Sequence, residues 1–231
     1  MDNPKSYRPI SLLCTTFKLY ERLLLERMMP LVEEILPDEQ AGFRPGRCTL
    51  DQVLNLTEDI EDSFQNNLKT GAVFVDLTAA YDTIWHRGLA LKLHQCIPSK
   101  HLIKMILELI SNRSFTLQLG DKKSRLRRLR NGLPQGSVLA PILFNIYTAD
   151  LPTTTSKQYV YADDICLATA AKTLDELSFT LTEDMKELGA YFHKWHLILS
   201  VEKTVASAFH LNNRQANHTL NVPHGERMLN H

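Results

Sequence analysis

Three aspartates stand where apolar runs end, at positions where carboxylates can do chemistry. Asp76 follows the apolar run 72–75, and Asp163 and Asp164 lie between two further apolar runs. A carboxylate beside a buried strand is unfavourable unless it is paired or bound to a cation. Hard oxygen ligands on rigid strands suit Mg²⁺. Taken alone, Asp-Asp is also a common pair in turns, so the neighbouring motifs have to distinguish a metal site from an ordinary turn.

A glycine- and proline-containing loop lies between the two acidic positions. This loop, residues 131–137 (NGLPQGS), leads into a predicted helix, whose first amides face anions. Tyr81 follows Asp76 by five residues. An acidic strand end, a glycine loop at a helix start and an acidic hairpin, in that order, form a much rarer combination than any one of them.

Hydrophobic periodicity predicts the elements that position these residues. Helices are expected at 18–32, 51–67, 137–151 and 173–195, with two more in 86–111 that are broken near Pro98. Strands are expected at 72–75, 158–161 and 165–169, a hairpin at 115–130 around residues 120–123, and an extended segment at 197–211. The predicted inward residues of the first two helices are Leu19, Leu23, Leu24, Met28, Leu31, Val53, Leu54, Leu56 and Ile60. This order of elements predicts an α+β fold with an antiparallel sheet.

The charge is balanced overall and uneven locally. The 231 residues hold 26 Lys+Arg and 26 Asp+Glu, which argues against a simple basic nucleic-acid binder. Residues 112–130, however, hold seven Lys/Arg and one Asp, and residues 51–66 hold five Asp/Glu and no Lys/Arg. The basic stretch immediately precedes the glycine loop, so it is a candidate for phosphate contacts, with a solvated hairpin as the alternative.

Composition excludes disorder, collagen-like repeats and a disulfide miniprotein, and the length permits one domain or two small ones. The four cysteines form no C-x-x-C pair, which argues against zinc, and the apolar neighbours of Cys14 and Cys166 predict buried free thiols in a reducing compartment. The sequence contains no secretory leader signal and no apolar run of membrane-spanning length, so a soluble, intracellular chain is expected.

Six motifs occur in an order that resembles the reverse transcriptase domain of non-LTR retrotransposons, close to the jockey-like elements. They are 7–13 (YRPISLL), 40–47 (QAGFRPGR), 74–77 with 80–82 (FVDL, AYD), 132–141 (GLPQGSVLAP), 161–164 (YADD) and Trp195 with 200–204 (SVEKT). The resemblance implies a right-hand polymerase: fingers in residues 1–70, a palm in 71–211 with inserted fingers helices and a hairpin, and a truncated tail in 212–231. An antiparallel palm sheet packed on helices is expected, and the thumb is expected to be missing.

The implied activity is RNA-directed DNA synthesis by two-metal nucleotidyl transfer to a primer 3′-hydroxyl. RNA template, DNA primer and deoxynucleoside triphosphates are the implied partners, two Mg²⁺ ions (or Mn²⁺) the cofactors, and the nucleus or cytoplasm the location. By analogy Asp76, Asp163 and the Leu77 carbonyl bind metal, Asp164 completes the acidic site, and Lys203 protonates pyrophosphate. Each role has a structural alternative, such as a polar turn at Lys203.

The resemblance also implies the nucleotide and nucleic-acid contacts. Tyr81 matches a steric gate against the 2′-hydroxyl of ribonucleotides, and Gln135, Gly136 and Arg8 are expected to contact the incoming nucleotide. Nucleic-acid contacts are expected from Arg44, Arg125, Arg127 and Arg128. The alternatives are a core tyrosine, a helix-entry turn and surface ion pairs.

Three rival functions are compatible with some of the same residues. A truncated or domesticated remnant would bind nucleic acid without polymerising. A viral-type RNA-templated RNA polymerase is disfavoured by Tyr81 and by Ala162 before the aspartates. A group II intron maturase is closer in fold, but the forms of motifs 43–47 and 161–162 favour the retrotransposon.

Overall fold

The computed structural model describes residues 10–212, 215, 218–225 and 227–230. Its chain divides into two compact units, each built from two separate stretches of sequence. The first unit combines Met1–Leu36 with Tyr81–Ala149, and the second combines Pro37–Ala80 with Asp150–His231. Residue 70, where the sequence placed the border between fingers and palm, lies inside the second unit.

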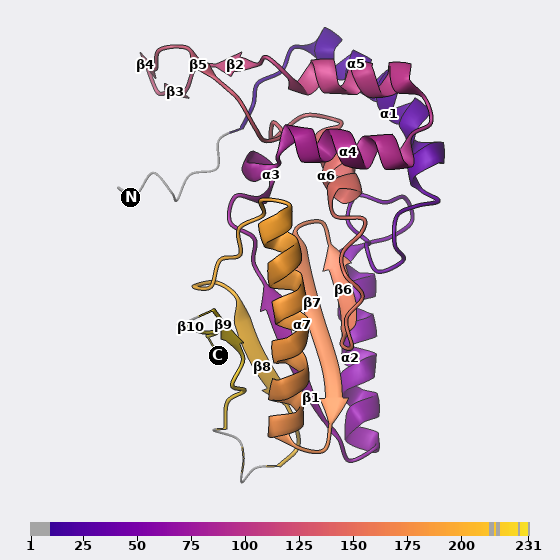
Figure 1. Cartoon of the computed structure of the whole chain (residues 1–231), viewed down its shortest axis with the longest axis vertical. Coiled ribbons are helices and arrows are strands. Elements are labelled where there is room, and N and C mark those ends of the chain that lie inside the picture. The colour runs from indigo at the N-terminus through magenta and orange to yellow at the C-terminus, as the bar shows by residue number, and fades with distance from the viewer. Residues whose placement is uncertain (1–9, 213–214, 216–217, 226, 231) are drawn as a thin grey trace. The chain divides into compact units, whose positions relative to one another are not determined.

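The second unit is built on a four-stranded antiparallel sheet (Figure 1). Its strands are β1 (Lys69–Val75), β6 (Lys157–Tyr161), β7 (Asp164–Ala171) and β8 (Val205–Phe209), in the order β6-β7-β1-β8. The strands predicted at 72–75, 158–161 and 165–169 are confirmed and are longer than expected. Within the predicted extended segment, β8 is the part that joins the sheet.

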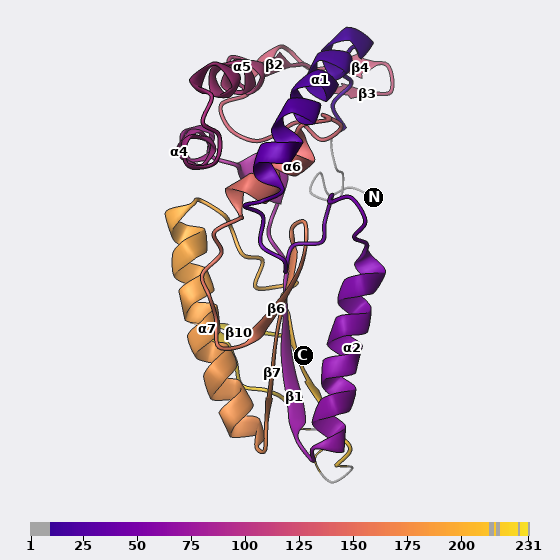
Figure 2. The ribbon, with the colours of Figure 1, turned by 90° about the vertical axis from the view of Figure 1, so that its right-hand side faces the viewer.

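Two helices, α2 (Thr49–Gln65) and α7 (Leu174–Lys194), cover opposite faces of this sheet, as Figure 2 shows edge-on. Helix α7 begins with a capping box, in which the Thr173 hydroxyl accepts from the Glu176 amide and the Glu176 carboxylate accepts from the Thr173 amide. Along α7, Leu177, Leu181 and Met185 are fully buried. Each such side chain contributes roughly 1.5–3 kcal/mol to stability.

The other face of the sheet packs against α2 with a different spacing from the one predicted. Leu56 packs on a cluster that includes Ala72 and Cys166, whereas Val53 and Leu54 are 53% and 51% exposed. The prediction that Val53 and Leu54 point inward is therefore wrong. In the first turn of α2, Gln52 donates instead to the Glu39 carbonyl of the preceding loop.

The C-terminal part of the second unit adds a small antiparallel pair, β9 (Pro223–His224) with β10 (Arg227–Met228). Strand β9 contacts α7. Asn230 forms a parallel bridge with Val205 at the start of β8. These contacts tie the described part of the predicted tail to the sheet.

The first unit is mainly helical. It contains α1 (Thr15–Val32), most of α3 (Ala80–Thr83), α4 (His86–Cys96), α5 (Lys100–Ile110) and α6 (Ala140–Tyr147). Helix α4 packs on α5 and on α6, and α6 is buried along almost its whole length. The break between α4 and α5 confirms the prediction at Pro98. Helix α6 is shorter than the predicted 137–151. It begins one residue before Pro141, which lies in its first turn, and its C-cap residue is Thr148.

Helix α1 buries a stripe that differs from the predicted one. The stripe consists of Glu21, Leu24, Met28 and Val32, at spacings of three and four residues. Leu19, Leu23 and Leu31, which were predicted to point inward, are 61%, 53% and 37% exposed. That prediction is wrong because it followed apolar residues alone, whereas a charged residue occupies one position of the buried stripe.

The basic stretch forms a hairpin in the first unit, as predicted. Strand β2 (Ser114–Phe115) pairs with β5 (Arg127–Arg128), and β3 (Gln118–Leu119) pairs with β4 (Lys122–Lys123). The turn is tighter than expected, because only Gly120 and Asp121 lie between β3 and β4. Gly120 has a φ of +56°, as two-residue hairpin turns require.

All four cysteines are free thiols, which agrees with the prediction made for Cys14 and Cys166. Cys166 is buried, and its burial raises its pKa to about 12. Cys14, in contrast, is exposed immediately before α1, so the prediction that its apolar neighbours would bury it is wrong. Among the residues that the structure describes, no helix is both long and apolar enough to cross a membrane.

Candidate active site

The acidic residues come together at one end of the four-stranded sheet. Val75 of β1 pairs with Ile165 of β7, so continuing this register by one residue places Asp76 opposite Asp164. Directly opposed residues in antiparallel strands have Cβ atoms ~4.5–5.5 Å apart. Asp163 lies in the two-residue turn between β6 and β7, next to this pair.

Asp76 and Asp164 also project from the same face of the sheet. Side chains alternate along a strand, so they share the face of Ala72 and Cys166, which belong to one buried cluster. The cluster is buried, whereas the Asp76 side chain is 36% exposed and Asp164 is exposed. The acidic end of the sheet is therefore accessible to ligands from water.

The segment before β8 holds the backbone of Asp76. The Asp76 amide donates to Oγ1 of the fully buried Thr204 at 3.2 Å, and its carbonyl accepts from the Ser200 amide at 2.8 Å. Lys203, from the same turn, places its Nζ 3.9 Å from Oδ2 of Asp76. With Lys203 71% exposed, this ion pair is weak and readily exchanged for another anion.

The Leu77 carbonyl points away from the β8 side. Leu77 is opposite Leu199 in an isolated antiparallel bridge, which continues the β1–β8 edge. Because carbonyls alternate along a strand and that of Asp76 points to Ser200, the next carbonyl points to the opposite side. Since β1 lies between β7 and β8, this is the side on which Asp164 lies.

These oxygens fit a divalent metal whose coordination is completed by a substrate. Within the described residues, no three His, Cys, Asp or Glu side chains form a preassembled metal cluster. Mg²⁺ does not require one, because it keeps several waters and binds one or two carboxylates together with substrate phosphates. Carboxylates at Asp76 and Asp163, with the Leu77 carbonyl, are a donor set of that kind.

Tyr81 belongs to the first unit, where its ring is fixed by stacking. The Tyr81 and Phe144 rings are 4.8 Å apart and inclined by only 20°, and Phe144 is fully buried in α6. The Tyr81 carbonyl accepts from the Leu133 amide at 2.7 Å. This bond joins the tyrosine to the loop that contains Gln135 and Gly136.

Gly132 makes this junction sterically possible. It has a φ of +87°, and a Cβ at this position would lie 2.6 Å from the Asp82 carbonyl oxygen. The Gly132 amide donates to the Ile84 carbonyl at 2.8 Å, and its carbonyl bonds to Nε2 of His86 at 2.8 Å. Any side chain would separate the loop from the Tyr81 segment.

A buried carboxylate holds the other end of this loop. Glu21 of α1 is 2% exposed; it accepts from the Ser137 hydroxyl and, at 3.0 Å, from the Val138 amide. The Gln135 carbonyl accepts from the Ser11 amide at 2.8 Å. Gln135 and Gly136 thus lie on a loop that is braced at both ends.

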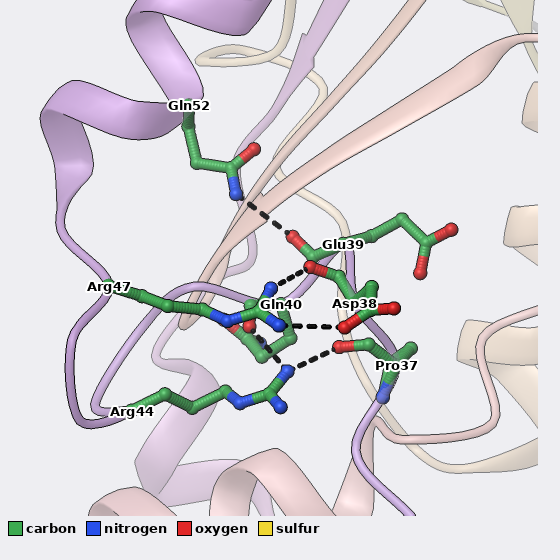
Figure 3. A network of polar contacts seen from close by, with 7 residues as sticks. All are labelled: Pro37, Asp38, Glu39, Gln40, Arg44, Arg47 and Gln52. Atoms are coloured by element: carbon green, nitrogen blue, oxygen red, sulfur yellow. Dashed lines mark hydrogen bonds and ion pairs between the residues drawn. The ribbon is translucent and has the colours of Figure 1, made fainter.

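Arg8 and Arg44 were both predicted to contact substrate or nucleic acid, and the structure describes only Arg44. Arg8 lies outside the described residues. Arg44 is 7% exposed, and its Nη1 donates to the Pro37 carbonyl at 2.7 Å and to the Gln40 carbonyl at 3.1 Å (Figure 3). This guanidinium braces its own loop, and its contact with nucleic acid stays a prediction.

The remaining predicted arginines lie on the hairpin of the first unit. Arg125, Arg127 and Arg128 are all exposed, as are Lys122 and Lys123. They form a cationic surface that is accessible to phosphates.

The structure therefore brings the predicted residues together in two groups. Asp76, Leu77, Asp163, Asp164 and Lys203 meet in the second unit, and Tyr81, Gln135 and Gly136 meet in the first.

Three supporting residues had no role in the sequence-based prediction. The role of Glu21 could have been predicted, because a charged residue within the apolar stripe of a helix indicates a buried polar contact. Gln40 lies in a recognised motif but had no assigned chemistry. Thr204 had no local signal, because its contact with Asp76 spans 128 residues.

The fold resembles that of solved telomerase structures. Telomerase of Candida albicans, solved in a complex with a fragment of telomeric RNA, matches with a TM-score of 0.57 over 86% of this chain and 34% of that one. The sequences are only 12% identical, so this likeness concerns the fold alone.

The sequence assigns the family. The family model "Reverse transcriptase (RNA-dependent DNA polymerase)" matches residues 2–221. The chain belongs to this reverse transcriptase family, as its motifs predicted.

Relatives from Drosophila melanogaster show which members of this family the chain resembles. The probable RNA-directed DNA polymerase from transposon BS is 37% identical over 91% of this chain, and that from mobile element jockey is 29% identical over 88%. The resemblance to the jockey-like group is confirmed. The chain spans about a quarter of the length of these relatives, 24% and 23%.

Proposed function

We propose that the chain carries the catalytic site of an RNA-directed DNA polymerase of a non-LTR retrotransposon. It would extend a DNA primer on an RNA template with deoxynucleoside triphosphates. The observation that carries this proposal is that Asp76, Asp163 and Asp164 lie together at one end of the sheet, in a chain that belongs to the reverse transcriptase family.

In this proposal the sheet of the second unit is the palm, and the helices and hairpin inserted between β1 and β6 belong to the fingers. The family match and the telomerase likeness support a polymerase architecture. A palm needs rigid strands beneath its acidic residues, and β1 is held by ladders on both sides.

Asp76, Asp163 and the Leu77 carbonyl would hold the divalent ions, with Asp164 completing the negative field. When bound, such ions activate the primer hydroxyl and neutralise charge on the triphosphate. Lys203 then has a role of its own. Its ammonium, which is paired only weakly with Asp76, would move to the leaving pyrophosphate and supply a proton.

Tyr81 would exclude the 2′-hydroxyl of a ribonucleotide, and Gln135 with Gly136 would contact the incoming nucleotide. Their support is the bracing described above: a ring stacked on Phe144 and a loop tied to Tyr81 and Glu21. A site that discriminates between substrates by shape needs rigid side chains around the substrate. Arg8 and Arg44 keep their predicted contacts as part of this proposal.

Primer extension tests the proposed function. We expect the purified chain to add deoxynucleotides to a DNA primer annealed to RNA in Mg²⁺ or Mn²⁺, and to stop when the metal is chelated. The rival outcome is a chain that shifts the primer–template in a binding assay but adds no nucleotide at any metal concentration. That result would identify a nucleic-acid-binding remnant and contradict the proposal.

The hairpin arginines predict a salt-dependent contact. Changing Arg125, Arg127 and Arg128 together to Gln should weaken primer–template binding and lower the slope of log affinity against log salt by about 2–3, as expected for two or three lost phosphate contacts. Fluorescence anisotropy at several salt concentrations measures both quantities. A matched control changes three exposed lysines to Gln: Lys172, which lies just before α7, and Lys186 and Lys194 of α7. An equal loss in the control would mean that net charge alone acts.

A further inference from the structure

Gln40 is a buried side chain whose whole amide is bonded to backbone. It is 3% exposed, and its Oε1 accepts from the Gly42 amide and from the Ala162 amide, each at 2.8 Å. Its Nε2 donates to the Ala162 carbonyl at 3.3 Å. One side chain therefore binds both the N–H and the C=O of the residue before Asp163.

The backbone around Gln40 lies directly against the β6–β7 hairpin. The Ala41 amide donates to the Val160 carbonyl at 2.9 Å, and the Val160 amide donates to the Glu39 carbonyl at 3.1 Å. These bonds form a short parallel bridge on β6. At Gly42 a Cβ would lie 2.3 Å from the Ala162 nitrogen, so the approach is too close for any side chain.

The loop that presents Gln40 is itself braced (Figure 3). Arg44 donates to the Gln40 carbonyl, and Arg47 donates to the carbonyl of Asp38 and, at 2.7 Å, to its Oδ1. Gln52 of α2 donates to the Glu39 carbonyl at 3.2 Å. Side chains on the second half of the loop and on α2 thus fix the carbonyls of its first half.

The contacted residue is in a strained conformation. Ala162, the first central residue of the turn, has a φ of +59°. A left-handed conformation is unfavourable for an L-residue, and in two-residue hairpin turns the position usually holds Gly or Asn. Such a conformation persists only where its surroundings hold it. The two hydrogen bonds between the Gln40 amide and Ala162 are contacts of that kind.

We propose that Gln40 is the positioning residue for Asp163: it fixes the peptide planes on both sides of Ala162 and so sets the direction in which the Asp163 carboxylate leaves the turn. The inference rests on the proposed function, in which Asp163 binds a catalytic metal. Gln40 touches neither metal nor substrate. Its loss should lower metal affinity and kcat and leave the KM for primer–template unchanged.

The test compares Gln40→Met with Gln52→Met in the full chain. Both remove a glutamine amide from the same loop network, but only the first contacts the turn. Amide hydrogen exchange, read by NMR without metal, should show the Ala162 amide exchanging about tenfold faster in Gln40→Met and unchanged in Gln52→Met. The affinity for Mn²⁺ should fall about tenfold, and kcat about tenfold to a hundredfold.

Unchanged exchange at Ala162, or the same acceleration in Gln52→Met, would overturn the inference. So would faster exchange with unchanged Mn²⁺ affinity. If Gln40→Met does not fold, Arg44→Lys takes its place, because it loosens the Gln40 carbonyl, and the same acceleration in smaller measure is expected. If the wild-type chain neither binds Mn²⁺ nor extends a primer, the proposed function fails, and exchange at Ala162 still decides whether Gln40 holds the turn.

Discussion

Changing Asp163 to Asn should lower the rate of nucleotide addition by at least about a thousandfold, equivalent to losing several kcal/mol of metal-assisted stabilisation. The fold should survive, because Asn has the same shape as Asp and is equally suited to a turn. What is lost is the negative charge at the end of the sheet, next to Asp76 and Asp164. Single-turnover primer extension measures the rate, and thermal unfolding measures the fold.

Asp62→Asn is the matched control for this change. Asp62 is an exposed aspartate of α2 in the same unit, so the substitution removes the same charge away from the acidic end of the sheet. We expect it to keep the wild-type rate. Extension by Asp163→Asn at more than about a tenth of the wild-type rate would show that Asp163 binds no essential metal.

Changing Tyr81 to Ala should reduce the preference for deoxynucleotides over ribonucleotides by about tenfold to a hundredfold. The wall next to the sugar would be removed, and a contact of this size is worth about 1–3 kcal/mol of discrimination. The measurement is the ratio of kcat/KM for a deoxynucleotide to that for the matching ribonucleotide. Removing the ring also removes its stacking on Phe144 and lowers stability. Partial unfolding lowers both rates equally, so the ratio isolates the gate.

Tyr81→Phe provides the control. It keeps the ring and the stacking on Phe144 and removes only the hydroxyl, so we expect the wild-type ratio. An unchanged ratio in an active Tyr81→Ala enzyme would contradict the gate and leave Tyr81 as a packing residue of the first unit.

The strands of the sheet and the positions of the aspartates at their ends could be predicted from the sequence, because both are marked by residues that are close together in the chain. β-Branched runs end in aspartates, and the strand pairing follows once the order of elements is known. The inward faces of the helices were less predictable. In α1 the buried stripe includes Glu21, and a charged residue is rarely buried unless it is paired, so apolar periodicity pointed to Leu19 and Leu23 instead.

The support of the site could not be predicted, because it depends on contacts far apart in the sequence. Nothing near Gln40 indicates that its amide will bind a residue 122 positions later. The same holds for Thr204 and Asp76. Such contacts follow from the tertiary arrangement of backbone groups, which no local pattern of residue types encodes.

The long separation of these contacts has a consequence for synthesis of the chain. In the described part of the chain the central strand β1 pairs with β7 and β8, both of which emerge from the ribosome much later, and Asp76 gains its contact with Thr204 only after 128 further residues. At about 5–20 residues per second this takes roughly 6–25 s. Until β7 has been made, the apolar strand β1 has two open edges, and until β8 has been made it has one, so newly made chains should depend on chaperones before they can gain any activity.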